Sequence, residues 1–225
     1  MKLQAKPGGN SRNFAIVFII GTLIPALHFI SPATANQALG APGAGKGTLS
    51  AYLAQKHKLV HYSVGDGLRF LTSEDLSPFI YREILDAINR NESEVKGILI
   101  DGYPRCIEQL DSFGIWPFQD MVPLSPGDDG RVSLDIKPDL VLSFQITKEN
   151  ARARYLGRAR DTNDGADKFE KRFKEYELET VPVEEKYRNR GILVSIDVNG
   201  TKEENIEALT GSLQQCDIWQ KVTST

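Results

Sequence analysis

The chain has little of what marks several classes of protein. Only two cysteines, Cys106 and Cys216, occur among its 225 residues. Two such distant cysteines argue against a disulfide framework and fit a reducing compartment, and no paired Cys and His spacing indicates a zinc site. The formal net charge of −3 argues against a nucleic-acid binder that depends on a general excess of positive charge. Internal repeats and low-complexity tracts are absent, and 40% hydrophobic with 25% charged residues describes an ordinary globular protein.

One long apolar run is present near the start of the chain. Residues 14–30 read FAIVFIIGTLIPALHFI without a formal charge, and three basic residues precede them. Ala33-Thr34-Ala35 follows, a small-x-small pattern like those that signal peptidases cleave. The combination is typical of a secretory signal peptide, while a short membrane anchor and a buried core segment remain alternatives.

This run divides the chain into two expected parts. Residues 1–35 are expected to form a hydrophobic leader, and residues 36–225 the folded domain. Contact with a membrane is then expected only through residues 14–30, and only if the leader is retained.

From residue 40 onward, short apolar runs alternate with helical patterns. The apolar runs are rich in Val, Ile and Leu, which is typical of buried parallel strands, and lie at residues 59–63, 97–100, 140–146 and 192–196. Helices are expected between them, at residues 46–56, 78–89, 149–158, 168–189 and 202–213. The alternation predicts an α/β fold with a central parallel sheet and helices on both faces. Residues 116–137, which contain Pro, Gly and Asp, are expected to form an inserted surface loop.

A glycine-rich segment opens the first expected helix. Its residues are Gly40, Ala41, Pro42, Gly43, Ala44, Gly45, Lys46, Gly47 and Thr48. Glycines at this spacing turn backbone amides toward one point, and a helix N-terminus behind them favours anions, so the segment predicts a polyphosphate site. Lys46 is expected to reach the outer phosphates of ATP, and Thr48 brings a hydroxyl near the metal.

A second signal is the string from Gly97 to Arg105. A short apolar strand there ends in Asp101-Gly102-Tyr103-Pro104-Arg105. Ligands bind open α/β sheets at the carboxyl ends of their strands, which is where Asp101 is expected to lie. A carboxylate at that place suits Mg²⁺, which bridges the phosphates during transfer.

Together these motifs resemble the adenylate kinase and UMP-CMP kinase family of nucleoside monophosphate kinases. The glycine-rich loop, the segment SVGDGLR at residues 63–69 and the string DGYPR at residues 101–105 occur in the family's order. The resemblance covers roughly residues 38–210. It implies a three-layer P-loop NTPase fold, ATP with Mg²⁺, a nucleoside monophosphate as acceptor, and a monomeric protein of the cytoplasm.

The resemblance also implies roles for the acceptor side of the site. Ser63 belongs to the segment that follows the second strand, where Arg69 would hold the acceptor phosphate together with Arg105. Asp66 and Asp101 would order the magnesium ion. Gln109 stands where adenylate kinases place a glutamine that reads the adenine of AMP, which favours AMP over UMP or CMP.

The arginines around residues 152–172 resemble those of the family's lid. Arg154 would stack on the base of ATP, and Arg158 and Arg172 would join Lys46 and Arg105 in stabilising the transferred phosphoryl group. Arg160 would help to bind the substrate. Guanidinium groups suit this work because they stay charged and bind oxygens in pairs. Gly200, after the last strand, would offer its backbone to the base of ATP.

The chain departs from the family's pattern at several places. Residues 34–39 (TANQAL) precede the glycine-rich loop, where a buried strand is expected. The acceptor region between residues 63 and 101 is short, the lid at residues 158–172 is also short, and residues 116–137 have no counterpart. These departures keep a second interpretation open, an ATP-binding relative with impaired catalysis that acts as a sensor or interaction protein. A kinase of another small metabolite is a weaker third one.

Overall fold

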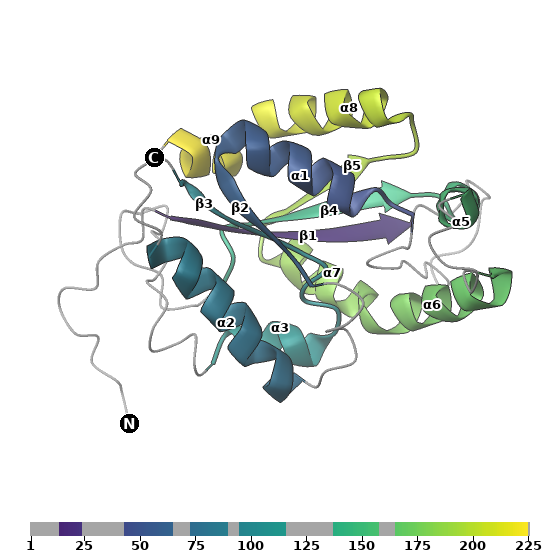
Figure 1. Ribbon diagram of the computed structural model, residues 1–225, viewed down its shortest axis with the longest axis horizontal. Helices are drawn as coiled ribbons and strands as arrows, with labels where there is room; N and C mark the ends of the chain where they lie inside the picture. Colours follow the sequence, from purple (N-terminus) through teal and green to yellow (C-terminus); the bar gives the residue numbers. More distant parts are fainter. Residues whose placement is uncertain are drawn as a thin grey trace.

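The computed structural model of the chain describes residues 14–23, 43–64, 73–89, 95–115, 137–157 and 165–224. Its centre is a parallel five-stranded sheet with the strand order β2-β3-β1-β4-β5 (Figure 1). The strands are β1 (Ala15–Leu23), β2 (Leu59–Ser63), β3 (Gly97–Asp101), β4 (Leu140–Ile146) and β5 (Leu193–Asp197). The fold is therefore the expected α/β arrangement of a P-loop NTPase.

The middle strand of this sheet comes from the apolar run near the start of the chain. β1 pairs with β3 from Ala15 to Ile19 and with β4 from Val17 to Leu23. Residues 15–20 are all buried. A strand with neighbours on both sides and helices over both faces must be apolar at every position, which explains the uninterrupted hydrophobic run. The interpretation of residues 1–35 as a leader outside the folded domain is therefore wrong for residues 15–23.

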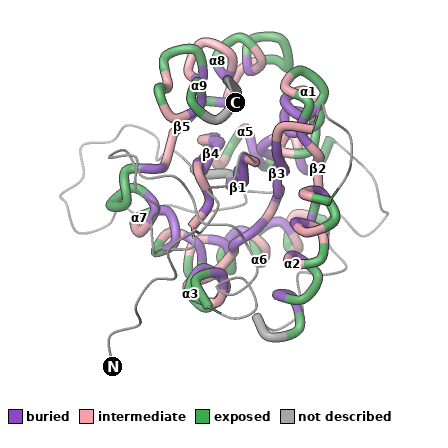
Figure 2. The backbone as a smooth tube through the Cα atoms, turned by 90° about the vertical axis from the view of Figure 1, so that its left-hand side faces the viewer, coloured by how far each residue is buried: buried purple, intermediate pink, exposed green. Residues whose placement is uncertain are grey.

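Helices cover both faces of the sheet and make it the middle of three layers. In both views α1, α8 and α9 lie over one face, and α2, α3, α6 and α7 lie over the other (Figures 1 and 2). The helices are α1 (Lys46–His57), α2 (Ser73–Asn89), α3 (Ile107–Phe113), α5 (Lys148–Gly157), α6 (Ala166–Glu179), α7 (Val181–Asn189), α8 (Lys202–Gln214) and α9 (Asp217–Ser224).

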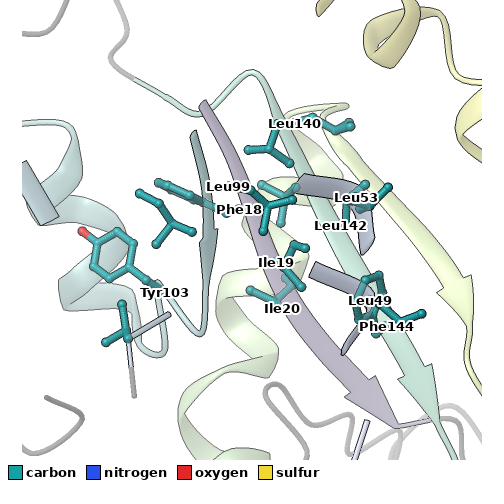
Figure 3. Packing of buried hydrophobic residues seen from close by; sticks show 14 of the residues in the cluster. Phe18, Ile19, Ile20, Leu49, Leu53, Leu99, Tyr103, Leu140, Leu142 and Phe144 are labelled. Atoms are coloured by element: carbon teal, nitrogen blue, oxygen red, sulfur yellow. The ribbon is translucent and has the colours of Figure 1, made fainter. Parts of the chain in front are cut away.

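The core is built around β1. Phe18 forms edge contacts with Tyr103 and Phe113, with ring centres 5.3 Å and 5.0 Å apart. Figure 3 shows Tyr103 on one side of β1 and Leu49 and Leu53 of α1 on the other. Each of these five side chains is at most 2% exposed, so the central strand anchors both helical layers.

The expected elements after residue 40 are present with small differences. β2 and β4 have the expected bounds, while the single helix expected at residues 168–189 is divided into α6 and α7. Thr180 separates the two helices, and Pro182 stands in the first turn of α7, where a missing N–H costs nothing. β1, α3 and α9 were not predicted.

Two further expectations lie outside the described residues. They are residues 34–39, which stand where the family's pattern has a strand but make a poor strand sequence, and nearly all of the inserted loop at residues 116–137, of which only residue 137 is described. Within the described ranges, every helix is too short or too polar to cross a bilayer.

Candidate nucleotide site

The start of α1 has the features of an anion site. Gly43 and Gly45 have positive φ angles of 99° and 77°, and Gly45 is the N-cap residue of α1. The amides of Thr48 and Leu49 donate to the carbonyl of Gly45 at 3.0 Å. Gly45 brings no side chain to cap the helix. The first amides of a helix have no partner within it, and the helix dipole places positive charge there, so this end favours phosphate.

Gly43 is packed against the backbone of another helix. A β-carbon at this position would overlap the carbonyl oxygen of Ala151 in α5. The glycine is therefore required both by its φ angle and by this close approach. Lys46 is half-buried, and Gly47 and Thr48 are exposed. Thr48 is thus accessible to solvent at the same end of α1.

Asp101 ends β3, beside the central strand. It pairs with Ile19 of β1 on one side and with Ser63 of β2 on the other. The side chain is buried, and the Ser63 hydroxyl donates to Oδ2 at 3.4 Å. Nε2 of His61 lies 3.7 Å from the same oxygen. A buried carboxylate at the carboxyl edge of the sheet is a suitable ligand for Mg²⁺.

The turn after Asp101 is tied to β2 and to itself. Arg105 donates from Nε to the carbonyl of Gly102 at 2.8 Å and from an Nη atom to the carbonyl of Val64 at 2.6 Å. The amide of Arg105 donates to Oε1 of Gln109 at 2.7 Å. The peptide bond between Tyr103 and Pro104 is cis. Arg105 and Gln109, two of the residues expected to bind the acceptor, are therefore brought together.

Tyr103 supports this turn from the core. Its hydroxyl donates to the carbonyl of Gln109 at 2.9 Å, and burial raises the pKa of Tyr103 well above its usual value. The hydroxyl consequently remains a donor at every physiological pH. Gln109 itself is only 5% exposed. A buried amide held in one orientation can read a hydrogen-bonding edge of a base more selectively than a mobile one.

Arg154 joins α5 to the connection between β5 and α8. Its guanidinium donates to the carbonyls of Val198 and Gly200 at 2.7 Å and 2.5 Å. Gly200 was expected to present backbone atoms to the base of ATP, and Arg154 to stack on that base. The structure brings the two residues together, and the guanidinium fixes the backbone of the connection.

Side chains that the sequence reasoning did not assign complete this connection. Oδ1 of Asn199 accepts from the amide of Thr147 at 2.8 Å and from the side-chain amide of Asn150 at 2.9 Å. Thr201 and Glu204 form a reciprocal capping box at the start of α8. The spacing Thr-x-x-Glu predicts this box, whereas no sequence pattern links Asn199 to Thr147.

Of the arginines in the short lid expected at residues 158–172, Arg172 lies in the described part. Arg172 of α6 is half-buried, with its guanidinium carbon 5.6 Å from the ring centre of Tyr155. Tyr155 belongs to α5, the helix that carries Arg154, so α6 and α5 are in contact next to the connection just described.

Seven of the expected site residues lie outside the described ranges. They are Gly40, Ala41, Pro42, Asp66, Arg69, Arg158 and Arg160. Within the described ranges, no group of three or more His, Cys, Asp or Glu side chains gathers as a metal site.

Comparisons with known proteins give one matching family and several named relatives. Residues 39–172 match the AAA domain family. The chain is 32% identical over 196 residues to a protein named adenylate kinase from a Nitratiruptor species, covering 79% of this chain and 93% of that protein. It is 31% identical over 190 residues to the adenylate kinase of Deinococcus radiodurans, covering 78% of this chain and 94% of the relative. A third adenylate kinase, from a Mycobacterium species, is 31% identical over 183 residues, covering 74% of this chain and 91% of the relative.

Proposed function

Because the chain belongs to the adenylate kinase family of nucleoside monophosphate kinases, we propose that it transfers the γ-phosphate of ATP to a nucleoside monophosphate. AMP is the acceptor that we favour, and UMP and CMP are further candidates. The observation that carries the proposal is the arrangement at the carboxyl edge of the sheet. The amide-rich start of α1, the buried carboxylate of Asp101 and the cationic turn at Arg105 lie there around one central strand.

Each part of this edge has a role in the proposed reaction. Lys46 and the amides at the start of α1 bind the outer phosphates of ATP, and Arg105, with Arg69, holds the acceptor phosphate. Phosphoryl transfer is catalysed mostly by such positioning and charge stabilisation. Asp101, together with Asp66, would hold a magnesium ion, which offsets charge on the transferred group. Arg158, Arg160 and Arg172 are proposed to add positive charge from the lid and to exclude water, a competing acceptor.

AMP is favoured because of Gln109. Its side chain is buried and its Oε1 is already engaged by the amide of Arg105. The side-chain NH₂ group of Gln109 would then donate a hydrogen bond to an acceptor atom on the base. A ring nitrogen of adenine is such an atom. We further propose that the protein acts in the cytoplasm as a monomer, with both cysteines as free thiols.

A transfer assay tests this function. The purified chain is mixed with ATP and Mg²⁺ and, in separate reactions, with AMP, UMP, CMP and GMP, and the diphosphate products are separated and counted. We expect AMP to be the best acceptor. The variant Lys46→Met, changed at a half-buried helix position, should keep its thermal midpoint and lose transfer by at least about 100-fold.

Two results would reject the proposal. One is the absence of transfer to any of the four acceptors by protein that is folded by circular dichroism. The other is transfer that is unchanged in Lys46→Met. Binding of ATP by calorimetry without any transfer would instead indicate a nucleotide-binding relative without kinase activity.

A further inference from the structure

The central strand and the glycine-rich loop are separated in the sequence by a long connection. β1 ends at Leu23, and the described part of the loop begins at Gly43. In the P-loop motif the strand runs directly into the loop and the loop into the helix, because the strand fixes where the phosphate-binding amides point. This chain contains the strand and the helix of that motif, but residues 24–39 separate the strand from the glycine-rich loop.

Gly21 occupies the position where a phosphate loop would leave this sheet. Ile19 is the residue of β1 that pairs with Asp101, and Gly21 stands two residues farther along the strand. A chain that left the sheet at Gly21 would therefore pass immediately beyond the level of Asp101. The phosphate loop and the Asp101 carboxylate would then belong to one phosphate and metal site, as the proposed function requires.

The sequence around Gly21 and Gly40 supports the same conclusion. Gly40 begins the motif Gly-Ala-Pro-Gly-Ala-Gly-Lys that ends at Lys46. If residues 22–40 are taken out, Gly21 joins Ala41, and the identical motif begins at Gly21, directly after the buried strand residues AIVFII. The first glycine of the loop is thus present twice, once at the end of β1 and once after the intervening segment.

The geometry of the described residues is compatible with such a direct junction. Leu23 pairs with Ile146 at the end of β4, and Gly43 lies against Ala151 in the helix that follows β4. The end of β1 and the loop glycine therefore border the same β4–α5 connection. In Figure 1 α1 begins beside the carboxyl end of β1, and the two elements are in contact. Ala41 and Pro42 alone would span up to about 11 Å between Gly21 and Gly43.

We propose that Gly21, like Gly40, can serve as the first residue of the phosphate loop. Residues 22–40 are then an insertion that weakens nucleotide binding because it separates β1 from the loop. This inference rests on the proposed function, since it concerns the same ATP site. The chain without residues 22–40 forms a continuous strand, loop and helix. Its loop is held in the binding conformation by the central strand, so less of the binding free energy is spent on ordering it.

Deletion variants of the full chain test the proposal. One lacks residues 22–40 and joins Gly21 to Ala41. The control lacks residues 22–38, so that Leu39 and Gly40 stay between Gly21 and Ala41. The control shortens the connection almost as much but moves the loop out of register with β1. ATP binding is measured by calorimetry, and the thermal midpoint is measured without nucleotide.

The junction at Gly21 should bind ATP about tenfold more tightly than the full chain and should unfold at a higher temperature. The control should show much less of both gains, because loop closure entropy alone changes only slowly with loop length. Equal gains in both deletions would overturn the proposal, as would unchanged binding and midpoint, or loss of folding, in the deletion of residues 22–40.

Failure of the proposed function has a different signature. A deletion of residues 22–40 that raises the thermal midpoint selectively, in protein that binds no ATP in any form, would reject the kinase function and leave the direct junction of β1 and the loop intact.

Discussion

The start of α1 and the connection from β5 to α8 lie at the same carboxyl edge of the sheet, and their helix termini are stabilised differently. At α8 the protein's own side chains satisfy the backbone: Thr201 and Glu204 cap the helix, and Arg154 and Asn199 tie the connection to α5. At α1 the cap residue is Gly45, which has no side chain. A terminus that is satisfied internally holds its shape without ligand, whereas one left to amides is suited to a bound phosphate.

Of the substitutions at these two helix termini, the largest loss of stability is expected at Gly43. The change Gly43→Ala introduces a β-carbon at positive φ and overlaps the backbone of Ala151. We expect the free energy of unfolding to fall by about 2–4 kcal/mol. ATP binding should weaken as well, because the loop is displaced.

Gly47→Ala is the matched control for this change. Gly47 lies inside α1, and a β-carbon there meets nothing within 4 Å. The control should raise stability by about 0.5–1 kcal/mol, because alanine favours helix over glycine. Urea unfolding of both variants measures the difference, and similar losses in the two would contradict the packing of Gly43 against α5.

At the other terminus, Arg154→Leu should have the next largest effect. It removes two charge-assisted hydrogen bonds to the carbonyls of Val198 and Gly200. The expected loss is about 2 kcal/mol in chemical denaturation. Arg152→Leu, which removes only an exposed ion pair at 3.9 Å from Glu170, should cost less than about 0.5 kcal/mol. Equal costs would mean that Arg154 does not hold the connection.

A smaller effect is expected from Thr201→Ala. This change removes the side-chain half of the capping box and leaves an amide of α8 without its acceptor. The cost should be about 1 kcal/mol by thermal or urea unfolding. Glu204→Gln preserves the reciprocal bond and should cost only a few tenths of a kcal/mol. If the two substitutions were equivalent, the start of α8 would not depend on its cap.

The smallest effect concerns the opposite end of α1, away from both connections. Burial, with Lys56 and Lys96 nearby, lowers the pKa of His57, whose ring contacts Trp219 of α9 at 4.9 Å. The unfolded chain therefore binds a proton at higher pH than the folded one. Stability is fully present above the unfolded pKa of about 6.5 and is reduced as the pH falls below it.

Substitution of this residue should remove its part of the pH dependence. We expect His57→Phe to lose less stability than the parent between pH 7 and pH 5, by under about 1 kcal/mol because solvent screens a partly exposed imidazole. Thermal unfolding across this range is the measurement. Parallel pH profiles for the two proteins would contradict the prediction, because they would mean that folding does not lower the pKa of His57.

The sequence predicted the elements after residue 40 well because their patterns are local. Apolar runs such as residues 140–146 and the helical segment at residues 202–213 need no knowledge of their neighbours. The same reasoning misassigned residues 15–23, since an uncharged apolar run has the same composition in a central strand as in a signal peptide. Only the pairing with β3 and β4 distinguishes the two cases.

In the candidate site, too, some local features were predictable from the sequence and long-range contacts were not. The position of Asp101 followed from the strand that ends in it, whereas the bond between Arg105 and Gln109 was not predicted. The bonds from Arg154 to residues 198 and 200 and from Asn199 to Thr147 join segments far apart in the chain. Such long-range contacts depend on how β4, α5 and β5 pack, which single-residue patterns do not encode.

The central place of β1 has a consequence for the protein during its synthesis. Of the five strands of the described sheet, β1 is synthesised first, but its two neighbours begin only at Gly97 and Leu140. The sheet cannot close around it until β4 has emerged, so its apolar residues are exposed to solvent for most of translation. During that time the unpaired strand presents the kind of exposed hydrophobic surface that makes partly folded chains prone to aggregate.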